Sequence, residues 1–267
     1  NTDASGQGSL VYGKTSDHVL GLESVLANGE LLATSPMPMA AAQELAKQTT
    51  TVAKLMQQVL SSCHDNRALI LEKFPRLNRF LTGYDLENVF NDDLSIVDLS
   101  RIITGSEGSL AFVCEAKLNL TAIANAKTLI NIKYDSFDSA LRHSPRLVEA
   151  KATSVETIDS KVLNLAKQDI VWQLVSDMLQ DVDGATMDGI NMVEYNGDSV
   201  ASVAKQVTAL CAELDKDIAN KTGVIGYQVT SDLASIGKLY TMRKKAVGLL
   251  GNTKGSQKPL AFAEDTA

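Results

Sequence analysis

Cysteine and histidine are scarce in this 267-residue chain, and neither forms a metal-binding or disulfide pattern. The three cysteines, Cys63, Cys114 and Cys211, are odd in number, lie far apart and include no CxxC pair. The three histidines are equally scattered. These spacings argue against a disulfide framework and against a thiolate zinc site. We therefore expect no metal site within the chain and a reducing, cytoplasmic location.

Long apolar runs, aromatic residues and excess positive charge are also missing. No apolar run approaches the roughly 18 to 20 residues that cross a bilayer, so we expect no membrane span in this chain. Lys and Arg number 25 against 32 Asp and Glu, the net charge is -7, and aromatics are only 5%. Proteins that bind nucleic acids need clustered Lys and Arg side chains and stacking aromatic rings. We therefore expect no nucleic acid as a partner of this chain.

The chain nevertheless contains enough apolar residues, 45%, to build one large domain or two ordinary ones. It starts at Asn1 without a methionine and stops at Ala267 just after an apolar stretch. Both ends read as cut, so the chain is expected to be an internal piece of a longer protein.

The N-terminal part is predicted to mix strands and helices. Asn28-Gly29 between apolar segments is a strong hairpin signal. Ser95 and Asp98 match a reduced capping box that would open a short helix through Ile103. The other expected elements are strands at 9–12, 18–27 and 31–32, a helix at 39–62 and a shorter helix at 66–73 that ends before a proline.

A strict alternation of apolar and other residues predicts a half-buried strand after residue 109. We expect Cys114 to be a small core residue in that strand. The residues predicted to share its face with Cys114 are Leu110, Phe112, Ala116, Leu118 and Leu120.

The character of the sequence changes after about residue 125, and we take 122–126 as the domain boundary. Ser136 is a plausible N-cap, and Ser144-Pro145 is expected to restart a short helix. Strands and helices mix without strict alternation, which predicts an α+β fold. The elements expected are strands at 127–134, 189–195, 223–229 and 259–263, and helices at 136–143, 159–166, 168–181, 198–220 and 231–249.

Two glycine-bearing segments could bring bare backbone close to a ligand. They are Thr2-Asp3-Ala4-Ser5-Gly6 and Gly105-Ser106-Glu107-Gly108-Ser109. Glycine permits positive φ, and exposed amides can hold a phosphate or a flavin edge. Neither segment matches a phosphate-binding fingerprint, so composition alone leaves an ordinary loop as the alternative.

Read in order, these segments and their neighbours resemble the second half of the vanillyl-alcohol-oxidase (PCMH) type of FAD-binding domain. Residues 1–6, the run from Tyr12 to Glu23 and Asn28-Gly29 are similar to its "T-N-A-G-G … Y-G-x-T-x-D-x-V-L-G-L-E" pattern. Residues 82–86 and 105–111 resemble its "T-G-Y-D-L" and "G-S-E-G-T-L-G". Residues 126–267 look like the C-terminal substrate (cap) domain of FAD-linked oxidases. The resemblance is strongest to large bacterial D-2-hydroxyglutarate dehydrogenases. It rests on the residues around Tyr84, on "GYQVT" at 226–230 and on "FAEDTA" at the end of the chain.

The resemblance implies a fold class of α+β, with two domains. Residues 1–125 would form the C-terminal part of a PCMH-type FAD domain with a helical insert at about 36–78. Residues 126–267 would form a truncated, ferredoxin-like α+β cap domain. The cofactor of the parent protein would be FAD, contacted by Thr2, Asp3, Ala4, Ser5, Gly6, Gly105, Glu107, Gly108 and Ser109. Asp3 and Ser5 depart from the family's Asn and Gly.

The family also implies an activity, the oxidation of a small D-2-hydroxy acid by hydride transfer to flavin. A 4Fe-4S region, the catalytic base and the metal-binding histidines would lie outside the chain, so no catalytic residue is named within it. An electron acceptor of unknown identity would complete the reaction, and through it the protein could associate with a membrane.

Two arginines are the expected substrate-binding residues. Arg243 aligns with the family's carboxylate-holding arginine, and Arg79 falls where a basic residue lies near the flavin. A guanidinium fork suits a carboxylate. The residues alone equally allow a solvated basic face at Arg243, Lys244 and Lys245 near a helix C-terminus, and a surface role for Arg79.

The sequence is also compatible with two other functions. One is a flavin oxidase of the same fold that acts on another alcohol. The other is a flavoprotein-derived interaction module that no longer binds cofactor, an alternative that Asp3 and Ser5 leave open.

Overall fold

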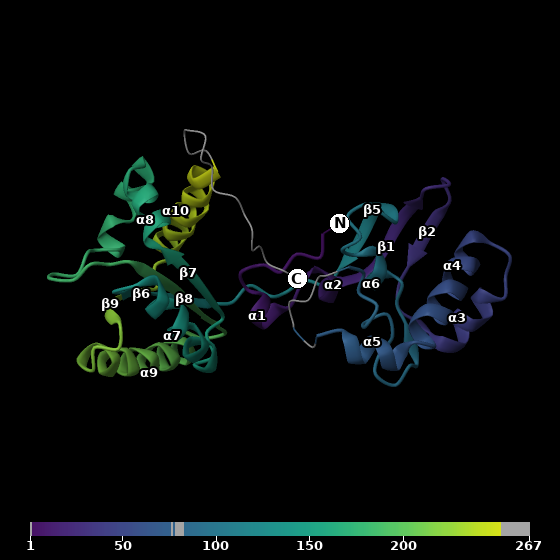
Figure 1. The fold of residues 1–267 in the computed structure, drawn as a ribbon, viewed down its shortest axis with the longest axis horizontal. Coiled ribbons are helices and arrows are strands. Elements are labelled where there is room, and N and C mark those ends of the chain that lie inside the picture. Colours follow the sequence, from purple (N-terminus) through teal and green to yellow (C-terminus); the bar gives the residue numbers. More distant parts are fainter. Residues whose placement is uncertain (1, 76, 78–82, 252–267) are drawn as a thin grey trace. The chain divides into compact units, whose positions relative to one another are not determined.

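The structure is a computed structural model that describes residues 2–75, 77 and 83–251. The chain divides into two compact units between Thr121 and Ala122, called here the N-terminal and C-terminal units (Figure 1). Sheets and helices occur in both, so the α+β fold class is confirmed.

A three-stranded antiparallel sheet forms the centre of the N-terminal unit. Its strands are β1 (Val19–Leu26), β2 (Leu31–Thr34) and β5 (Ala111–Leu118), in the order β2-β1-β5. The predicted hairpin at Asn28-Gly29 is confirmed. Gly29 takes φ +85° and the Asn28 side chain accepts from the Glu30 amide at 3.1 Å, which closes the turn.

The long helix predicted at 39–62 is two helices. The chain forms α3 (Met39–Ala46), then α4 (Thr51–Val59), which continues into a π-helical turn η1 (Leu60–His64). Thr50 interrupts the run because its hydroxyl caps α4, accepting from the Ala53 amide at 3.1 Å. The shorter helix is confirmed as α5 (Arg67–Lys73).

These helices pack around a core of their own. Two short strands, β3 (Met37–Pro38) and β4 (Ile96–Val97), pair antiparallel at its edge. The buried core residues are Ala42, Met56, Cys63, Ile70, Val89, Phe90, Val97 and Leu99.

The prediction for the buried face of β5 is wrong. Phe112 is 74% exposed and Cys114 is exposed, whereas Ala111 is buried and packs with Val19 and Leu22. The alternation is real, but a period of two defines two faces and does not say which one is covered. A register irregularity beside Glu23 leaves Cys114 without a paired residue in β1.

Two short segments also differ from expectation. Residues predicted as a strand at 9–12 form a single helical turn, α1 (Ser9–Tyr12), because Gly6 and Gly8 carbonyls accept from Ser9 and Tyr12 amides. A second turn, α2 (Thr15–His18), follows at once. The capping box expected at Ser95 is absent, since Ile96–Val97 is a strand. Instead, α6 (Ser100–Ile103) starts where Asp98 accepts from the Ser100 amide.

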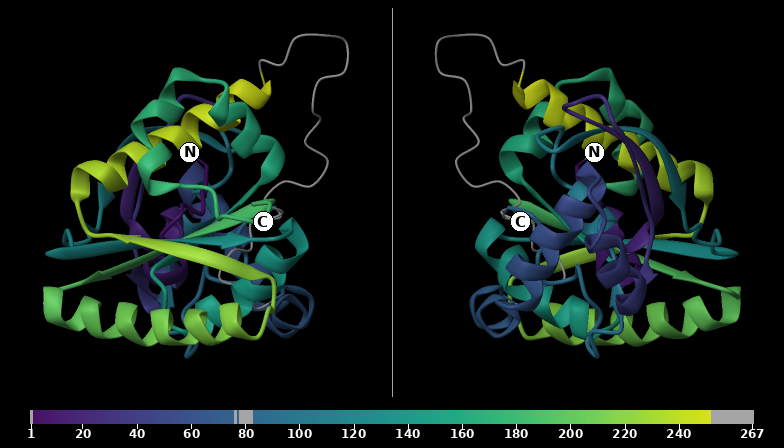
Figure 2. Two further views of the ribbon diagram at one scale, coloured as in Figure 1. Left: turned by 90° about the vertical axis from the view of Figure 1, so that its left-hand side faces the viewer. Right: turned by 90° about the vertical axis from the view of Figure 1, so that its right-hand side faces the viewer.

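The C-terminal unit is a ferredoxin-like β-α-β-β-α-β arrangement. All strand pairs are antiparallel and the order β7-β8-β6-β9 is that of a split β-α-β fold. Figure 2 (left) shows the sheet edge-on, with α9 below and α10 above. Its elements are β6 (Ala126–Tyr134), α7 (Phe137–Glu149), β7 (Ser154–Asp159), α8 (Ser160–Lys167), β8 (Gly189–Gly197), α9 (Val200–Ala219), β9 (Val224–Thr230) and α10 (Leu233–Gly251).

Each face of this sheet carries a separate apolar core. Ile130, Val193 and Leu214 belong to the core under α7 and α9. Leu129, Met192 and Met242 belong to the core under α8 and α10. The central strands β6 and β8 are therefore buried on both faces, so that polar residues within them, Asn131 and Asn191, are buried as well.

Two predictions for this unit are corrected, and one strand was missed. Helix α7 runs through Pro145 instead of restarting, because Ala140 and Leu147 on either side of it are buried against the same core. The helix expected at 168–181 is two short 3₁₀ turns, Ile170–Leu174 and Ser176–Met178, and Asp169 caps the first. Strand β7 was not predicted. The strand expected at 259–263 lies outside the described residues.

Candidate cofactor and substrate sites

The N-terminal unit brings the two glycine-bearing segments together. A Cβ added at Gly105 would lie 3.0 Å from the Cβ of Asp3, and Gly105 takes φ +86°. Only glycine fits there without displacing Asp3, because both the contact and the left-handed backbone disfavour a side chain. The Ala4 carbonyl accepts from the Thr15 amide at 3.2 Å and so holds the first segment against α2.

The Asp3 carboxylate points into the protein. One oxygen accepts from the Ser16 amide at 2.6 Å, and the other accepts from the Ser16 hydroxyl at 2.9 Å and pairs with Lys14 at 2.6 Å. Asp3 is only 5% exposed. Its side chain therefore fixes the segment, and contact with a ligand would fall to the backbone and to the neighbouring residues.

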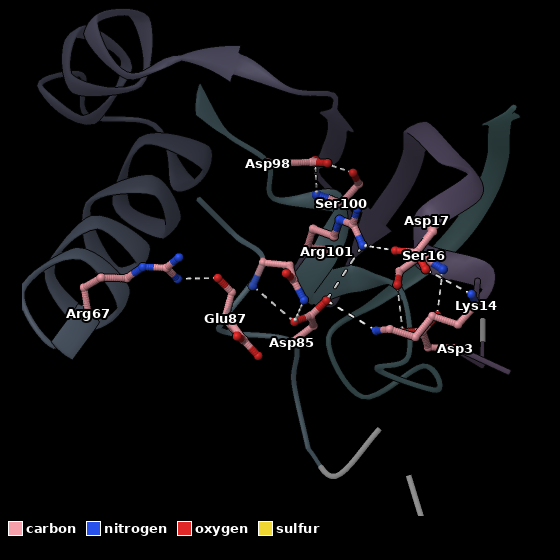
Figure 3. Close-up of polar contacts among 11 residues, drawn as sticks. Asp3, Lys14, Ser16, Asp17, Arg67, Asp85, Glu87, Asp98, Ser100 and Arg101 are labelled. Atoms are coloured by element: carbon pink, nitrogen blue, oxygen red, sulfur yellow. Dashed lines mark hydrogen bonds and ion pairs between the residues drawn. The ribbon is translucent and has the colours of Figure 1, made fainter. Parts of the chain in front are cut away.

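Lys14 connects the Asp3 segment to a third segment, which contains Asp85. Its ammonium lies 2.6 Å from Asp3 and 3.5 Å from Asp85, and Lys14 is 7% exposed (Figure 3). Arg101 of α6 closes the cluster, with its guanidinium 3.0 Å from Asp17 and 4.0 Å from Asp85. Burial raises the pKa of Asp17, but the Lys14 amide and Arg101 outweigh this and hold the pKa below its ordinary value.

Polar groups without partners surround the joined segments. The buried hydroxyls of Ser5, Thr104 and Ser106 make no hydrogen bond in the described structure. Glu107 and Gly108 follow with φ +49° and +84°, and space is open around Gly6 and Gly108. Buried polar groups normally have partners, so these hydroxyls and this open, glycine-bearing backbone suit a ligand with several acceptors and donors, as FAD has.

Tyr84 borders the same cluster. Its hydroxyl lies 3.0 Å from the Ser109 hydroxyl, and Ser109 in turn donates to the Ser106 carbonyl at 2.6 Å. Tyr84 is 40% exposed. Among the other residues predicted to contact cofactor, Thr2, Ala4, Glu107 and Ser109 are exposed along the two segments, where a ligand could reach them.

In the C-terminal unit, Arg243 of α10 pairs with a carboxylate of the sheet. Its guanidinium lies 2.6 Å from Glu156 of β7, and the two side chains are 42% and 17% exposed. One carboxylate cannot satisfy all five donors of a guanidinium, so donors remain for a second anion. Lys244 and Lys245 are exposed. The other predicted substrate-binding residue, Arg79, lies outside the described residues.

A second carboxylate anchors the same helix. Tyr240 donates to Glu194 of β8 at 2.5 Å, and Glu194 also pairs with Lys127 at 3.1 Å. Asn131 of β6, 1% exposed, has no partner for either side-chain amide atom within the described structure. The sheet beneath α10 thus carries polar groups at the border of its apolar core.

Sequence reasoning missed Lys14, Asp85, Arg101 and Glu156. Lys14 and Asp85 lie inside the motifs quoted above, but nothing in those motifs indicates that the two side chains pair. Lys14 is 71 residues from Asp85, and Glu156 is 87 residues from Arg243. No local pattern reports such pairs.

Among the described residues, no group of three or more His, Cys, Asp or Glu side chains could hold a metal ion. Within those residues, no helix is both long enough and apolar enough to cross a membrane.

Comparison with known proteins gives a consistent relationship. The FAD linked oxidases, C-terminal domain, match residues 123–267, which is more than half of the chain. D-2-hydroxyglutarate dehydrogenase of Escherichia coli (strain K12) is 57% identical over 267 residues, and that of Pseudomonas putida (strain KT2440) is 42% identical over 268. The match covers all of this chain but only 26% of each relative.

Solved structures agree on the fold. A structure of alkyldihydroxyacetonephosphate synthase has a TM-score of 0.52 and 15% identity, covering 94% of this chain and 35% of that protein. Because the identity is low, this likeness concerns the fold alone. With more than half of its length matching their C-terminal domain, the chain belongs to the family of FAD-linked oxidases.

Proposed function

We propose that the chain is part of an FAD-dependent dehydrogenase that oxidises a D-2-hydroxy acid of the D-2-hydroxyglutarate class to the 2-oxo acid. The observation that carries the proposal is 57% identity, along the entire chain, to a protein named D-2-hydroxyglutarate dehydrogenase. The chain spans about a quarter of that relative, so the activity belongs to the longer protein.

In this proposal the N-terminal unit supplies part of the FAD site. Ser5, Thr104 and Ser106 offer buried hydroxyls that no described residue pairs with, and a side chain added at Gly6 or Gly108 would meet no described atom within 4 Å. Bound FAD supplies the acceptor for the hydride that leaves the carbon bearing the hydroxyl. The protein residues bind and orient the reactants and exclude water.

Arg243 would hold the carboxylate of the acid. Its side chain is 42% exposed, so a small anion can reach the donors that Glu156 leaves unused. The proton of the substrate hydroxyl would pass to a base outside this chain. A 4Fe-4S region would also lie outside the chain and carry electrons to an acceptor. The cellular location that we propose is the cytoplasm, because the three cysteines are free thiols.

The alternative of a module that has lost its cofactor rested on Asp3 and Ser5. Asp3 is paired with Lys14 at 2.6 Å, and its buried carboxylate also accepts from the Ser16 amide. Ser5 adds a buried hydroxyl that has no hydrogen-bond partner among the described residues. Both replacements are therefore compatible with a retained cofactor site.

The test uses the whole protein that contains this chain. Its visible flavin spectrum is recorded without oxygen, before and after D-2-hydroxyglutarate, D-lactate or glycolate is added in turn. Bleaching by D-2-hydroxyglutarate is expected. A flavin band that none of the acids bleaches would move the substrate to another alcohol, and no flavin band even with added FAD would leave the interaction module.

The carboxylate anchor is tested separately with Arg243→Ala. The KM for D-2-hydroxyglutarate should rise at least tenfold, because a charge-assisted contact of about 1.5–3 kcal/mol is lost. The matched control is the exposed neighbour, Lys244→Ala, which should leave KM within twofold. Equal KM values for the Arg243 variant and the unmodified enzyme would show that another residue holds the carboxylate.

A further inference from the structure

Lys14 is a buried cation between two carboxylates that belong to different segments. Asp3 lies 2.6 Å away in the first glycine-bearing segment, and Asp85 lies 3.5 Å away beside Tyr84. The side chain of Lys14 is 8% exposed, those of Asp3 and Asp85 are 6% and 11%. Figure 3 shows the lysine reaching between them.

Such a cluster depends on every member. A buried charge is strongly unfavourable unless it is paired, so removing the ammonium would leave two carboxylates buried close together. Arg101 does not replace it, because its guanidinium lies 3.0 Å from Asp17 and 4.0 Å from Asp85, and no ion pair within the described residues joins it to Asp3. Without Lys14, the two segments would repel each other.

Both segments carry groups assigned above to the cofactor site. Asp3 abuts Gly105, and Ser5, two residues on, has a hydroxyl without a partner in the part of the chain that the structure describes. Asp85 follows Tyr84, whose hydroxyl lies 3.0 Å from that of Ser109. A displacement of either segment would therefore move one side of the site relative to the other.

We propose that Lys14 is a positioning residue for FAD, an ammonium that holds the Asp3 and Tyr84-Asp85 segments at the spacing that FAD requires. This inference rests on the proposed function, since it takes these segments as the FAD site. Lys14 acts through the two carboxylates and is assigned no contact with FAD.

The experiment measures FAD binding to the apoprotein of the whole protein by flavin fluorescence, together with the thermal unfolding midpoint of that apoprotein. Lys14→Met keeps most of the side-chain volume and removes the charge. Its Kd for FAD should rise at least tenfold. The matched control is Lys47→Met, which breaks an exposed pair of the same 2.6 Å length with Glu44 and should leave Kd within twofold.

A second variant tests the coupling. Asp3→Asn combined with Lys14→Met removes one buried charge of each sign, so at least threefold of the lost affinity should return relative to Lys14→Met alone. If Lys14→Met does not fold, Asp85→Asn removes the ion pair between Lys14 and Asp85 and should still raise the Kd for FAD at least threefold. A purely structural role for Lys14 would lower the unfolding midpoint and leave Kd for FAD within twofold, and that result would overturn the inference.

Failure of this inference can be separated from failure of the proposed function. If the unmodified protein binds no FAD, the proposed function itself is wrong. If the unmodified protein binds FAD and is bleached by a 2-hydroxy acid, yet the lysine and aspartate variants bind FAD equally well, only the role of Lys14 is wrong.

Discussion

At the scale of single residues, the structure is marked by buried polar groups that depend on distant partners. His143 on α7 shows this outside the proposed sites. Its Nδ1 lies 2.7 Å from the Tyr134 hydroxyl, its Nε2 lies 3.5 Å from Asp217, and Arg146 pairs with the same carboxylate at 3.0 Å. Asn191 donates to the Tyr134 hydroxyl, which leaves that hydroxyl free to donate to an unprotonated Nδ1.

This geometry predicts a pH dependence of stability. Burial lowers the pKa of His143 and Arg146 lowers it further, against an opposing effect of Asp217. Because the folded pKa lies below the unfolded value of about 6.5, the unfolded chain binds more protons in acid. The stabilisation is complete above about pH 6.5 and is lost as pH falls through the folded pKa.

The measurement is the free energy of unfolding between pH 8 and pH 5 for the unmodified protein, His143→Gln and His64→Gln. The unmodified protein and the His64 control, whose side chain is 46% exposed, should lose stability in parallel below about pH 6.5. The His143 variant should lose less. Parallel loss in all three proteins would mean that other groups set the acid sensitivity.

At the scale of elements, local signals determined where helices start, and single side chains often decided the outcome. Ser136 and Ser199 cap α7 and α9 by accepting from Ser139 and Ser202 amides. Thr50 does the same for α4 and so divides the predicted long helix. A hydrophobic stripe reports that a stretch is helical, but it does not report a break that one hydroxyl can stabilise.

We expect Thr50→Ala to destabilise the protein by about 1 kcal/mol, the usual cost of losing an N-cap hydroxyl. Two features favour a measurable effect: α4 buries Ala53 and Met56, and Ala53 provides the capped amide. Denaturant unfolding compares this variant with Thr49→Ala, an exposed neighbour outside the helix, which should change stability by less than about 0.5 kcal/mol. Equal effects of the two changes would contradict the role of Thr50 as a cap.

At the scale of the whole molecule, we propose that the chain is two domains joined near 122–126. The compact units separate between Thr121 and Ala122, and the family match starts at residue 123. Leu120 and Ile123 are 87% and 94% exposed, and residues 120–124 make no hydrogen bond in the described structure. Exposed backbone without hydrogen bonds is the usual site of proteolysis.

Brief chymotrypsin treatment of this chain should therefore cut after Leu120 first. The product beginning at Thr121 should keep its ferredoxin-like sheet, visible as retained circular dichroism and cooperative unfolding. Leu120→Asp should suppress this cut without affecting later ones. First cleavage inside β6 or α9 would show that the C-terminal part is not an independent domain.

The sequence by itself determined many of the local elements, and it indicated the family. Apolar periodicity located α9, Asn28-Gly29 located a hairpin, and the order of short motifs pointed to FAD-linked oxidases. These signals suffice because helix, strand and turn preferences depend on residues only a few positions apart.

Only the tertiary structure decided which side of an element is covered and which charges meet. It exposed Phe112 and Cys114, placed Lys14 between Asp3 and Asp85, and paired Arg243 with Glu156. Each outcome depends on where remote parts of the chain lie in space. Burial and ion pairing act over a few ångströms of space, whatever the number of residues between the partners.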